Sequence, residues 1–363
     1  MLALSPMISP ALPLLPPRAE MERAFRSGDA GYLGVFFVGV RTTGIFCLPT
    51  CTPPRKPRPE NCEYFASVRD VVFAGYRPCK LCRPTELAGK PPDWVAQLIQ
   101  QVEREPGSKL TAADLRNLGV SPERARRWFM ENHGLTFTAW CRARRLSAAF
   151  TKIREGENLD DVALGHGFES HSGFRDAFTR TFGEAPGRSR KGACLFTTMI
   201  ETPIGRFLAA TNDGGLVMFE FTDRRMLEHH FEVLRRRFAA PLVPGDHAHF
   251  ETLRREIAEY FAGTRRDFTV PLAPCGTAFQ ERVWTELRLI PYAQTISYEA
   301  LAIAIGQPTA MRAVALANGS NRLAILIPCH RVIGKDGSLT GYGGGLGRKR
   351  LLLELERTGR LPG

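Results

Sequence analysis

Apolar and polar residues follow two different periods along this chain. Residues 196–221 alternate around Pro-Ile-Gly and Asp-Gly-Gly, and this period of two predicts β-hairpins. Helical spacing follows at 224–238 and 247–262. Before the hairpins, the same helical spacing is found at 94–103, 111–118, 122–132, 137–154, 159–164 and 173–182. The middle of the chain is therefore predicted to be entirely helical.

The last part of the chain combines helices with one apolar run. Residues 279–302 predict a helix, a proline turn and a second helix that opens at Ser-Tyr. Residues 308–333 predict another helix, a Gly-Ser-Asn turn and a buried strand, and a Gly-rich loop and a final helix follow. Cys329 and His330 come directly after Pro328, so two reactive side chains are predicted where the buried strand ends.

Proline and glycine divide the chain into parts. Breaks at 83–93 and 183–193 separate a cysteine-rich segment, the helical middle and the remainder, and 363 residues suit two to four domains. The opening residues 1–20 are apolar but interrupted by prolines, so they are predicted to be a disordered leader rather than a signal peptide.

The chain is basic throughout rather than at one end. The net charge is +12, and it is shared evenly, with 12 Lys+Arg against 8 Asp+Glu in residues 1–93, 16 against 12 in 94–192 and 21 against 17 in 193–363. Such a balance suits a polyanionic partner. No apolar run approaches the roughly 20 residues that a membrane span needs, so nucleic acid is favoured over membrane.

Four cysteines are spaced like a metal site. Cys47, Cys51, Cys79 and Cys82 form a C-x3-C and a C-x2-C pair, and two such pairs can place four thiolates around one tetrahedral Zn²⁺. Unpaired buried cysteines are the alternative, and Cys62 is predicted to be one. Nine cysteines are too few and odd in number for a secreted disulfide framework, which favours a reducing, cytoplasmic compartment.

The sequence around these cysteines resembles a known domain. VRTTGIFCLPTC (40–51) and GYRPCKLCRP (75–84) are similar to the amino-terminal zinc domain of the Ada family of alkylation repair proteins. The resemblance implies that Cys47 is both a zinc ligand and the acceptor of a methyl group from a DNA methylphosphotriester. Methylation would make the site less negative, so DNA binding should tighten and switch on transcription. Backbone contacts are expected from Thr42, Thr43, Arg77 and Arg83. Leu48 departs from the family, which usually has arginine there.

The helical middle resembles a tandem helix-turn-helix domain. The Gly-His-Gly-Phe stretch within residues 159–190 is similar to the carboxy-terminal half of the AraC-type DNA-binding domain, and 110–158 fits its other half. Two such units would place recognition helices in successive major grooves. The residues expected to face DNA are Arg124, Arg127, Arg175 and Thr179. A small helical bundle with a solvated basic face is the alternative.

Residues 196–361 resemble the O6-alkylguanine-DNA alkyltransferases, on the motif PCHRV and the segments around it. The order of the blocks is that of the Ada family. The resemblance implies a multidomain α+β protein: a zinc-bound α/β domain (21–88), an all-α tandem helix-turn-helix domain (93–192), an RNase H-like N-lobe (196–272) and a winged-helix-like catalytic lobe (273–361).

The same resemblance implies how the alkyltransferase residues act. Cys329 would attack the alkyl carbon on guanine O6, or that of O4-methylthymine, while His330 takes the thiol proton through a water molecule and Glu356 orients His330. Asn321 would brace the adjoining loop, and Tyr298 would hydrogen-bond the leaving base. The residues expected at the DNA are Arg312, which fills the space of the flipped base, Arg331, and Tyr342 with Gly343. Some relatives have serine at Gly343.

These expectations define a stoichiometric DNA repair methyltransferase that is also a transcriptional activator. No residue or organic cofactor is expected to regenerate the acceptor cysteines, so each would react once. The expected partners are duplex DNA with alkyl lesions, promoter DNA and RNA polymerase, with the chain monomeric, cytoplasmic and nucleoid-associated when bound to DNA. The alternative is a DNA-binding regulator or damage sensor in which only one acceptor site is active.

Overall fold

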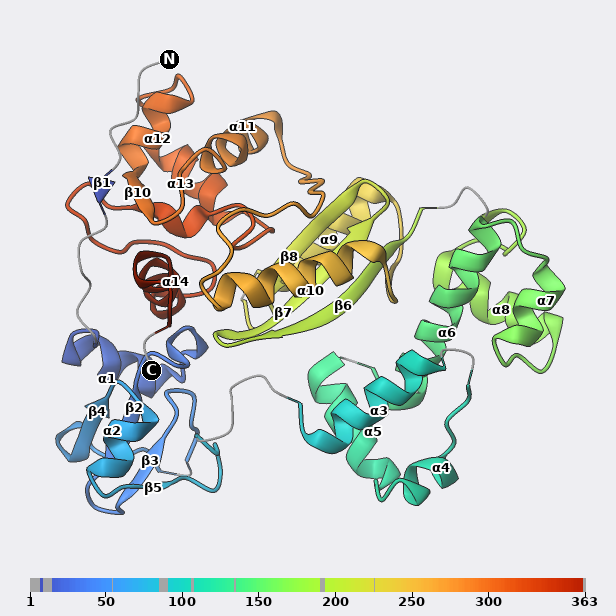
Figure 1. Cartoon of the computed structure of the whole chain (residues 1–363), viewed down its shortest axis with the longest axis horizontal. Helices are drawn as coiled ribbons and strands as arrows, with labels where there is room; N and C mark the ends of the chain where they lie inside the picture. Colours follow the sequence, from blue (N-terminus) through green and yellow to red (C-terminus); the bar gives the residue numbers. More distant parts are fainter. Residues whose placement is uncertain are drawn as a thin grey trace.

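The computed structural model describes residues 7–8, 15–53, 55–84, 91–105, 108–133, 135–189, 193–224 and 226–361. Figure 1 shows a small blue sheet domain, a green helical domain, a yellow sheet lobe and an orange-to-red helical lobe. The predicted multidomain α+β class is confirmed.

The cysteine-rich domain is a twisted four-stranded sheet with short helices. Its strand order is β4 (Cys62–Phe65), β2 (Phe37–Val40), β3 (Ile45–Cys47) and β5 (Arg77–Pro78). The helical elements are α1 (Arg18–Ser27), η1 (Ala30–Tyr32), η2 (Pro59–Asn61) and α2 (Val68–Phe73). Strands β3 and β5 pair in parallel, so their carboxyl ends, and the cysteines that follow them, lie at one edge.

The middle of the chain is helical, as the apolar spacing predicts. Its elements are α3 (Asp93–Arg104), α4 (Ala112–Asn117), α5 (Pro122–His133), α6 (Phe137–Arg154), α7 (Leu159–Gly165) and α8 (His171–Phe182). Helix α6 joins two small cores, because Trp140 packs with Phe129 of α5 while Phe150 stacks on Phe182 of α8. The first half therefore has its own apolar centre, whereas the second half shares its apolar cluster with Phe196 of the N-lobe.

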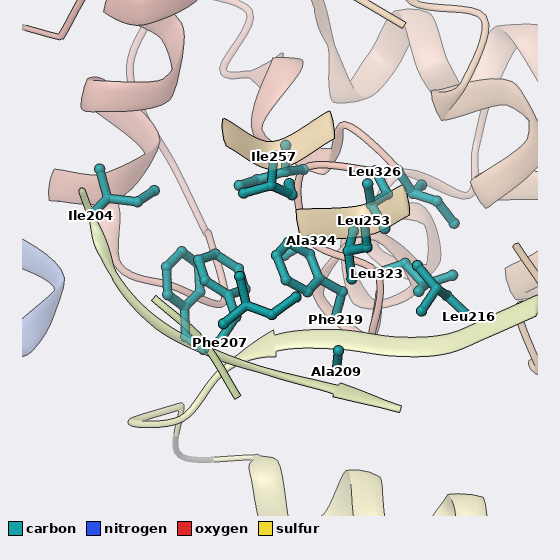
Figure 2. Packing of buried hydrophobic residues seen from close by; sticks show 14 of the residues in the cluster. Ile204, Phe207, Ala209, Leu216, Phe219, Leu253, Ile257, Leu323, Ala324 and Leu326 are labelled. Atoms are coloured by element: carbon teal, nitrogen blue, oxygen red, sulfur yellow. The ribbon is translucent and has the colours of Figure 1, made fainter. Parts of the chain in front are cut away.

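The N-lobe is a sheet covered by a helix on each face. The hairpin prediction is confirmed by β6 (Leu195–Thr202), β7 (Gly205–Asn212) and β8 (Gly215–Phe221), which pair antiparallel, and β9 (Leu242–Pro244) joins β6 in parallel. Because side chains alternate between faces, one face packs on α9 (Leu227–Phe238) and the other on α10 (Ala248–Phe261). On the α10 face, Phe219 packs near Leu253 and Leu323, as Figure 2 shows, so this sheet supports the segment before Cys329.

The catalytic lobe carries the remaining helices around a small sheet. It contains α11 (Ala278–Leu287), β10 (Gln294–Ser297), α12 (Tyr298–Ala304), α13 (Met311–Gly319), η4 (Cys329–Arg331), β11 (Val332–Ile333) and α14 (Leu346–Thr358). Strand β10 pairs in parallel with β11 and was not predicted from the sequence.

The prediction of a buried strand before Cys329 is wrong. Leu323 makes one isolated bridge to Phe219, and the chain then turns, with Ile325 at φ 70°. The run is apolar because it is buried on all sides, and burial alone does not separate a turn from a strand. We call residues 321–328 the bracing turn.

The predicted disordered leader departs from the structure at two places. Met7–Ile8 form β1, which pairs antiparallel with β10, and α1 begins at Arg18. The rest of the leader up to residue 14 lies outside the described residues.

The domains touch through glycine, charged and aromatic residues. A Cβ built on Gly31 of η1 would lie 2.9 Å from Gly345 Cα, so the cysteine-rich domain meets the start of α14 backbone to backbone (Figure 1). Between the helical domain and the N-lobe, Arg144 pairs with Asp246 at 2.5 Å and Arg154 donates to Asp213 at 3.2 Å.

Candidate nucleophile and metal sites

The bracing turn holds Cys329 at the start of η4. Asn321 Nδ2 donates to Ile327 O at 2.9 Å and to Cys329 Sγ at 3.1 Å, while Asn321 Oδ1 accepts from Leu323 N at 2.9 Å. One amide side chain thus closes the turn, which is the bracing role predicted for Asn321, and it also contacts the thiol, which was not predicted. Cys329 is only 5% exposed, so a reaction partner must enter the protein to reach it.

Beside Cys329, His330 forms a buried pair with Glu356 of α14. His330 Nε2 lies 2.7 Å from Glu356 Oε1. The carboxylate also accepts from Tyr260 Oη at 2.8 Å and from Ala293 N at 3.1 Å. Glu356 is therefore fixed from several elements, and it fixes the imidazole in turn.

The prediction that Arg331 contacts DNA is wrong. Its side chain is 8% exposed, and its Nε and Nη2 each donate to Glu356 at 2.9 Å. Nη1 donates to Ile290 O at 2.7 Å. A guanidinium with these partners is buried inside the lobe, so Arg331 belongs to the Glu356 network rather than to the DNA surface.

The electrostatics of this network make His330 a base. Burial opposes ionisation of Glu356, but His330 and Arg331 together hold its pKa below the ordinary value. Burial lowers the pKa of His330, although Glu356 acts in the opposite direction, so the imidazole is neutral near pH 7. A carboxylate can only accept, so Nε2 carries the proton. Nδ1 keeps its lone pair and has no hydrogen bond among the described residues.

The thiol of Cys329 needs that base. Burial raises its pKa, while the Asn321 hydrogen bond and the charges of Arg224 and Lys349 lower it. Lys349 was missed by the sequence analysis. It is fully buried and donates from Nζ to Val332 O at 2.5 Å and to Thr340 O at 2.6 Å, and burial lowers its pKa to about 8. In the sequence Gly-Arg-Lys-Arg, Lys349 has the neighbours of a solvated side chain, so no local pattern reveals that it is buried.

Tyr298 and the glycine loop, which we define as residues 341–345, lie together. Tyr298 Oη donates to Gly341 O at 3.3 Å and accepts from Asn318 Nδ2 at 3.5 Å. Tyr342 follows with a buried hydroxyl that has no partner among the described residues, and its ring lies 6.5 Å from that of His330. The predicted residues Tyr298, Tyr342 and Gly343 therefore border the same region as His330.

Helix α13 presents an unpaired cation on an open face. Arg312 is exposed and has no ion-pair partner among the residues that the structure describes. Leu316, one turn later, is 76% exposed, whereas Val314 and Ala317 are buried. This exposed face agrees with the predicted role of Arg312, and the exposed Leu316 beside it was not predicted.

The four cysteines of the predicted metal site converge. The sulfur atoms of Cys47, Cys51, Cys79 and Cys82 all lie within 4.8 Å of one another. Cys62 lies apart, with its sulfur 3.5 Å from Arg58 O, which confirms its packing role.

Charge repulsion within the cluster calls for a cation. Contact with Cys82 raises the pKa of Cys47 most, burial raises that of Cys51 to about 12, and only Cys82, through its contact with Cys47, is lowered to about 6. Four neighbouring thiols cannot all ionise without a compensating charge, and a closed all-sulfur set is the ligand geometry of structural Zn²⁺.

The residues predicted to approach DNA from these domains are exposed. This applies to Thr42, Thr43, Arg77, Arg83, Arg124, Arg127, Arg175 and Thr179. Leu48, the departure from the family, instead packs on the small core of Phe46 and Val71. Helix α8 is capped by Ser170, whose hydroxyl accepts from Gly173 N at 3.1 Å.

Four family models match this chain in order. They are described as "Metal binding domain of Ada" (residues 20–85), "Helix-turn-helix domain" (115–192), "6-O-methylguanine DNA methyltransferase, ribonuclease-like domain" (195–274) and "6-O-methylguanine DNA methyltransferase, DNA binding domain" (278–358).

Similar proteins match the whole chain or its last part. The "Bifunctional transcriptional activator/DNA repair enzyme Ada" of Escherichia coli (strain K12) is 35% identical over 334 residues, which are 89% of this chain and 92% of that protein. The "Methylated-DNA--protein-cysteine methyltransferase" of Mycobacterium tuberculosis is 46% identical over 159 residues, 44% of this chain and 90% of that protein. The solved structure of Mycobacterium tuberculosis OGT in complex with DNA is 41% identical, covers 46% of this chain and 95% of that chain, and has a TM-score of 0.40. Among the described residues, no helix is both long and apolar enough to cross a membrane.

Proposed function

Because the chain belongs to the Ada family of bifunctional transcriptional activators and DNA repair enzymes, we propose that Cys329 and Cys47 are its two alkyl acceptors. It is a methylated-DNA–protein-cysteine methyltransferase that holds one Zn²⁺ on four cysteines.

Alkyl transfer at Cys329 begins with removal of its proton. Neutral His330 takes the proton from Sγ at Nδ1, through a water molecule, while Glu356 Oε1 holds the opposite nitrogen at 2.7 Å. The thiolate attacks the alkyl carbon on guanine O6: the S–C bond forms, the C–O bond breaks, and its electron pair passes to the base. The leaving guanine takes up one proton at a ring nitrogen through Tyr298, so the proton lost by the thiol is balanced.

A buried nucleophile requires the damaged base to leave the helix. Cys329 is 5% exposed, and a base inside a duplex cannot reach it, so the base must be flipped. Arg312 and Leu316 project from one exposed face of α13, and there they would fill the space left in the stack. Tyr342 and the glycine loop then border the flipped base. The proposal extends to O4-methylthymine, which offers the same alkyl–oxygen bond.

Cys47 is proposed as the acceptor from methylphosphotriesters. Cys47, Cys51, Cys79 and Cys82 would hold the Zn²⁺, which when bound would supply the positive charge that keeps their sulfurs deprotonated and nucleophilic. Cys47 comes at the end of β3, and the exposed Thr42, Thr43, Arg77 and Arg83 would contact the DNA backbone around it. Methylation removes one negative charge from the partly buried four-sulfur cluster, so the cluster repels the DNA phosphates less, DNA binding tightens and the chain activates transcription.

The helical domain would then carry promoter recognition. Arg124 and Arg127 on α5, and Arg175 and Thr179 on α8, are exposed on separate helices that α6 joins. Alkylated duplex DNA is the supported partner class. We propose promoter DNA and RNA polymerase as further partners, and a monomeric, cytoplasmic chain that associates with the nucleoid when it binds DNA.

The observation that carries the proposal is the contact of Asn321 Nδ2 with Cys329 Sγ at 3.1 Å, beside the His330–Glu356 pair. The test is exposure to duplex DNA with labelled O6-methylguanine, followed by peptide mapping. The label is expected on the Cys329 peptide, in Cys275→Ser as in the unchanged protein, and is expected to be lost in Cys329→Ser. Transfer by Cys329→Ser at the normal rate would refute the assignment. Label from methylphosphotriester DNA on Cys47 separates the bifunctional proposal from a chain with one active site.

A further inference from the structure

An arginine of the N-lobe reaches into the nucleophile site. Arg224 follows strand β8, and its side chain is 6% exposed. Its Nη1 donates to Asn321 O at 2.8 Å, and its Nη2 donates to Gly319 O. Both acceptors lie at the end of α13 and the start of the bracing turn. The guanidinium therefore joins the N-lobe sheet to the residue whose side chain contacts the thiol.

Arg224 is itself fixed from the N-lobe. Its Nη1 pairs with Glu220, which is fully buried in β8 and accepts from Phe221 N at 2.9 Å through the other carboxylate oxygen. A buried ion pair of this kind is costly to desolvate unless its hydrogen bonds are satisfied. Here both partners are engaged, so the position of the guanidinium is set by the sheet.

The same guanidinium lies under the glycine loop. A Cβ built on Gly343 would lie 2.7 Å from Arg224 Nε and 2.7 Å from Nη2, closer than real side-chain contacts allow. With Arg224 held in this position, glycine fits at 343, and a serine side chain of the kind some relatives carry would force the guanidinium to move. Arg224 occupies the space between the bracing turn and the loop proposed to border the flipped base.

The charge of Arg224 acts on the thiol as well. Burial raises the pKa of Cys329, and the Asn321 hydrogen bond and Arg224 are the leading influences that lower it. A cation held near a buried thiol favours the thiolate, the reactive form.

We propose that Arg224 is a positioning residue for alkyl transfer, which locks the bracing turn against the glycine loop and favours the thiolate of Cys329. This rests on the proposed role of Cys329 as acceptor. It assigns the N-lobe a part in the chemistry rather than only in support of the fold. The alternative is that Arg224 only clamps the two lobes together.

Three variants separate the positioning role of Arg224 from a purely structural clamp between the two lobes. Arg224→Met removes both the charge and the two guanidinium donors. Arg224→Lys keeps the charge but not the paired donors, and Arg265→Met is the matched control. Arg265 is also an N-lobe arginine, paired with Glu259 at 2.6 Å and with the buried Glu256 at 3.4 Å, but it has no contact with the bracing turn.

The measurement is the pH dependence of Cys329 alkylation by iodoacetamide, resolved by mass spectrometry of its peptide, together with single-turnover methyl transfer. Arg224→Met is expected to move both midpoints to higher pH and to slow Cys329 alkylation near pH 7, because a nearby cation that favours the thiolate is lost. Arg224→Lys should keep the midpoint but lose rate, because it cannot hold Asn321 O and Gly319 O together. Arg265→Met should leave the midpoint unchanged.

Unchanged midpoints in Arg224→Met would overturn the proposal, and so would an equal shift in Arg265→Met. Should Arg224→Met not fold, judged by circular dichroism, Arg224→Lys decides: a wild-type transfer rate in that variant contradicts the positioning role. Iodoacetamide needs no DNA, so these results stand apart from the acceptor assignment, which fails if unchanged protein takes no methyl on Cys329 or if Cys329→Ser transfers at the normal rate.

Discussion

Replacing Glu356 with glutamine tests the buried network directly. The amide keeps the shape of the side chain but removes the charge that Arg331 contacts with two hydrogen bonds of 2.9 Å. Arg331 is then left buried without a counter-ion, and breaking such a pair costs about 3–5 kcal/mol. Against a typical domain stability of about 5–15 kcal/mol, the lobe should remain folded but clearly weakened.

The stability lost in Glu356→Gln should depend on pH. His330 and Arg331 hold the pKa of Glu356 below its ordinary value, so its contribution is complete above the unfolded pKa of about 4.3 and is lost as the pH falls below that value. The stability gap between the two proteins should therefore narrow as the pH falls from about 4.3 toward pH 3. Transfer from O6-methylguanine should also slow, by about 10²–10⁴-fold, because His330 loses its orientation.

Hydrogen exchange read by mass spectrometry suits this comparison, since it reports local opening within the full chain. Peptides from α14 and from residues 321–333 should lose protection in Glu356→Gln, while those from α5 and α6 should not. Equal protection of α14 in both proteins, or a stability gap that widens as the pH falls from about 4.3 toward pH 3, would contradict the proposed role of Glu356 in this network.

Three further changes test the other parts. Arg312→Ala should slow transfer from duplex DNA by about tenfold or more with no loss of thermal stability, because only the flipped state needs Arg312; single-turnover kinetics check this, and an unchanged rate contradicts it. Cys51→Ser should remove zinc, measured by elemental mass spectrometry, and end methylation of Cys47 while that of Cys329 continues; retained zinc would mean that Cys51 is not a ligand. Ser170→Ala should cost α8 about 1 kcal/mol and weaken promoter binding, and equal affinity would argue against α8 as a reader.

The sequence predicts the regular elements well where their period is unambiguous. The six helices of the middle segment and the hairpins at 195–221 agree with the structure to within about three residues, because each has one apolar face and a clear cap or turn. The aliphatic run before Cys329 could not be assigned this way. It is buried on every side, and the bonds from Asn321 that bend it join residues whose pairing only the folded turn reveals.

The site residues that belong to a motif could be predicted from the sequence, whereas the residues that only burial brings to the site could not. Cys329, His330, Asn321 and Glu356 come together as the resemblance implies. Arg331, Lys349 and Arg224 have sequence surroundings typical of solvated charges, yet each is buried by contacts from distant elements. Long-range pairing of this kind leaves no periodic signal.

The most direct test of the account is an intact-mass measurement after exposure to duplex DNA that carries both O6-methylguanine and methylphosphotriesters. We expect two added methyl groups per chain, one on the Cys47 peptide and one on the Cys329 peptide, with no further gain on longer exposure. Methyl groups on other cysteines, or an unmodified Cys329 peptide, would contradict it.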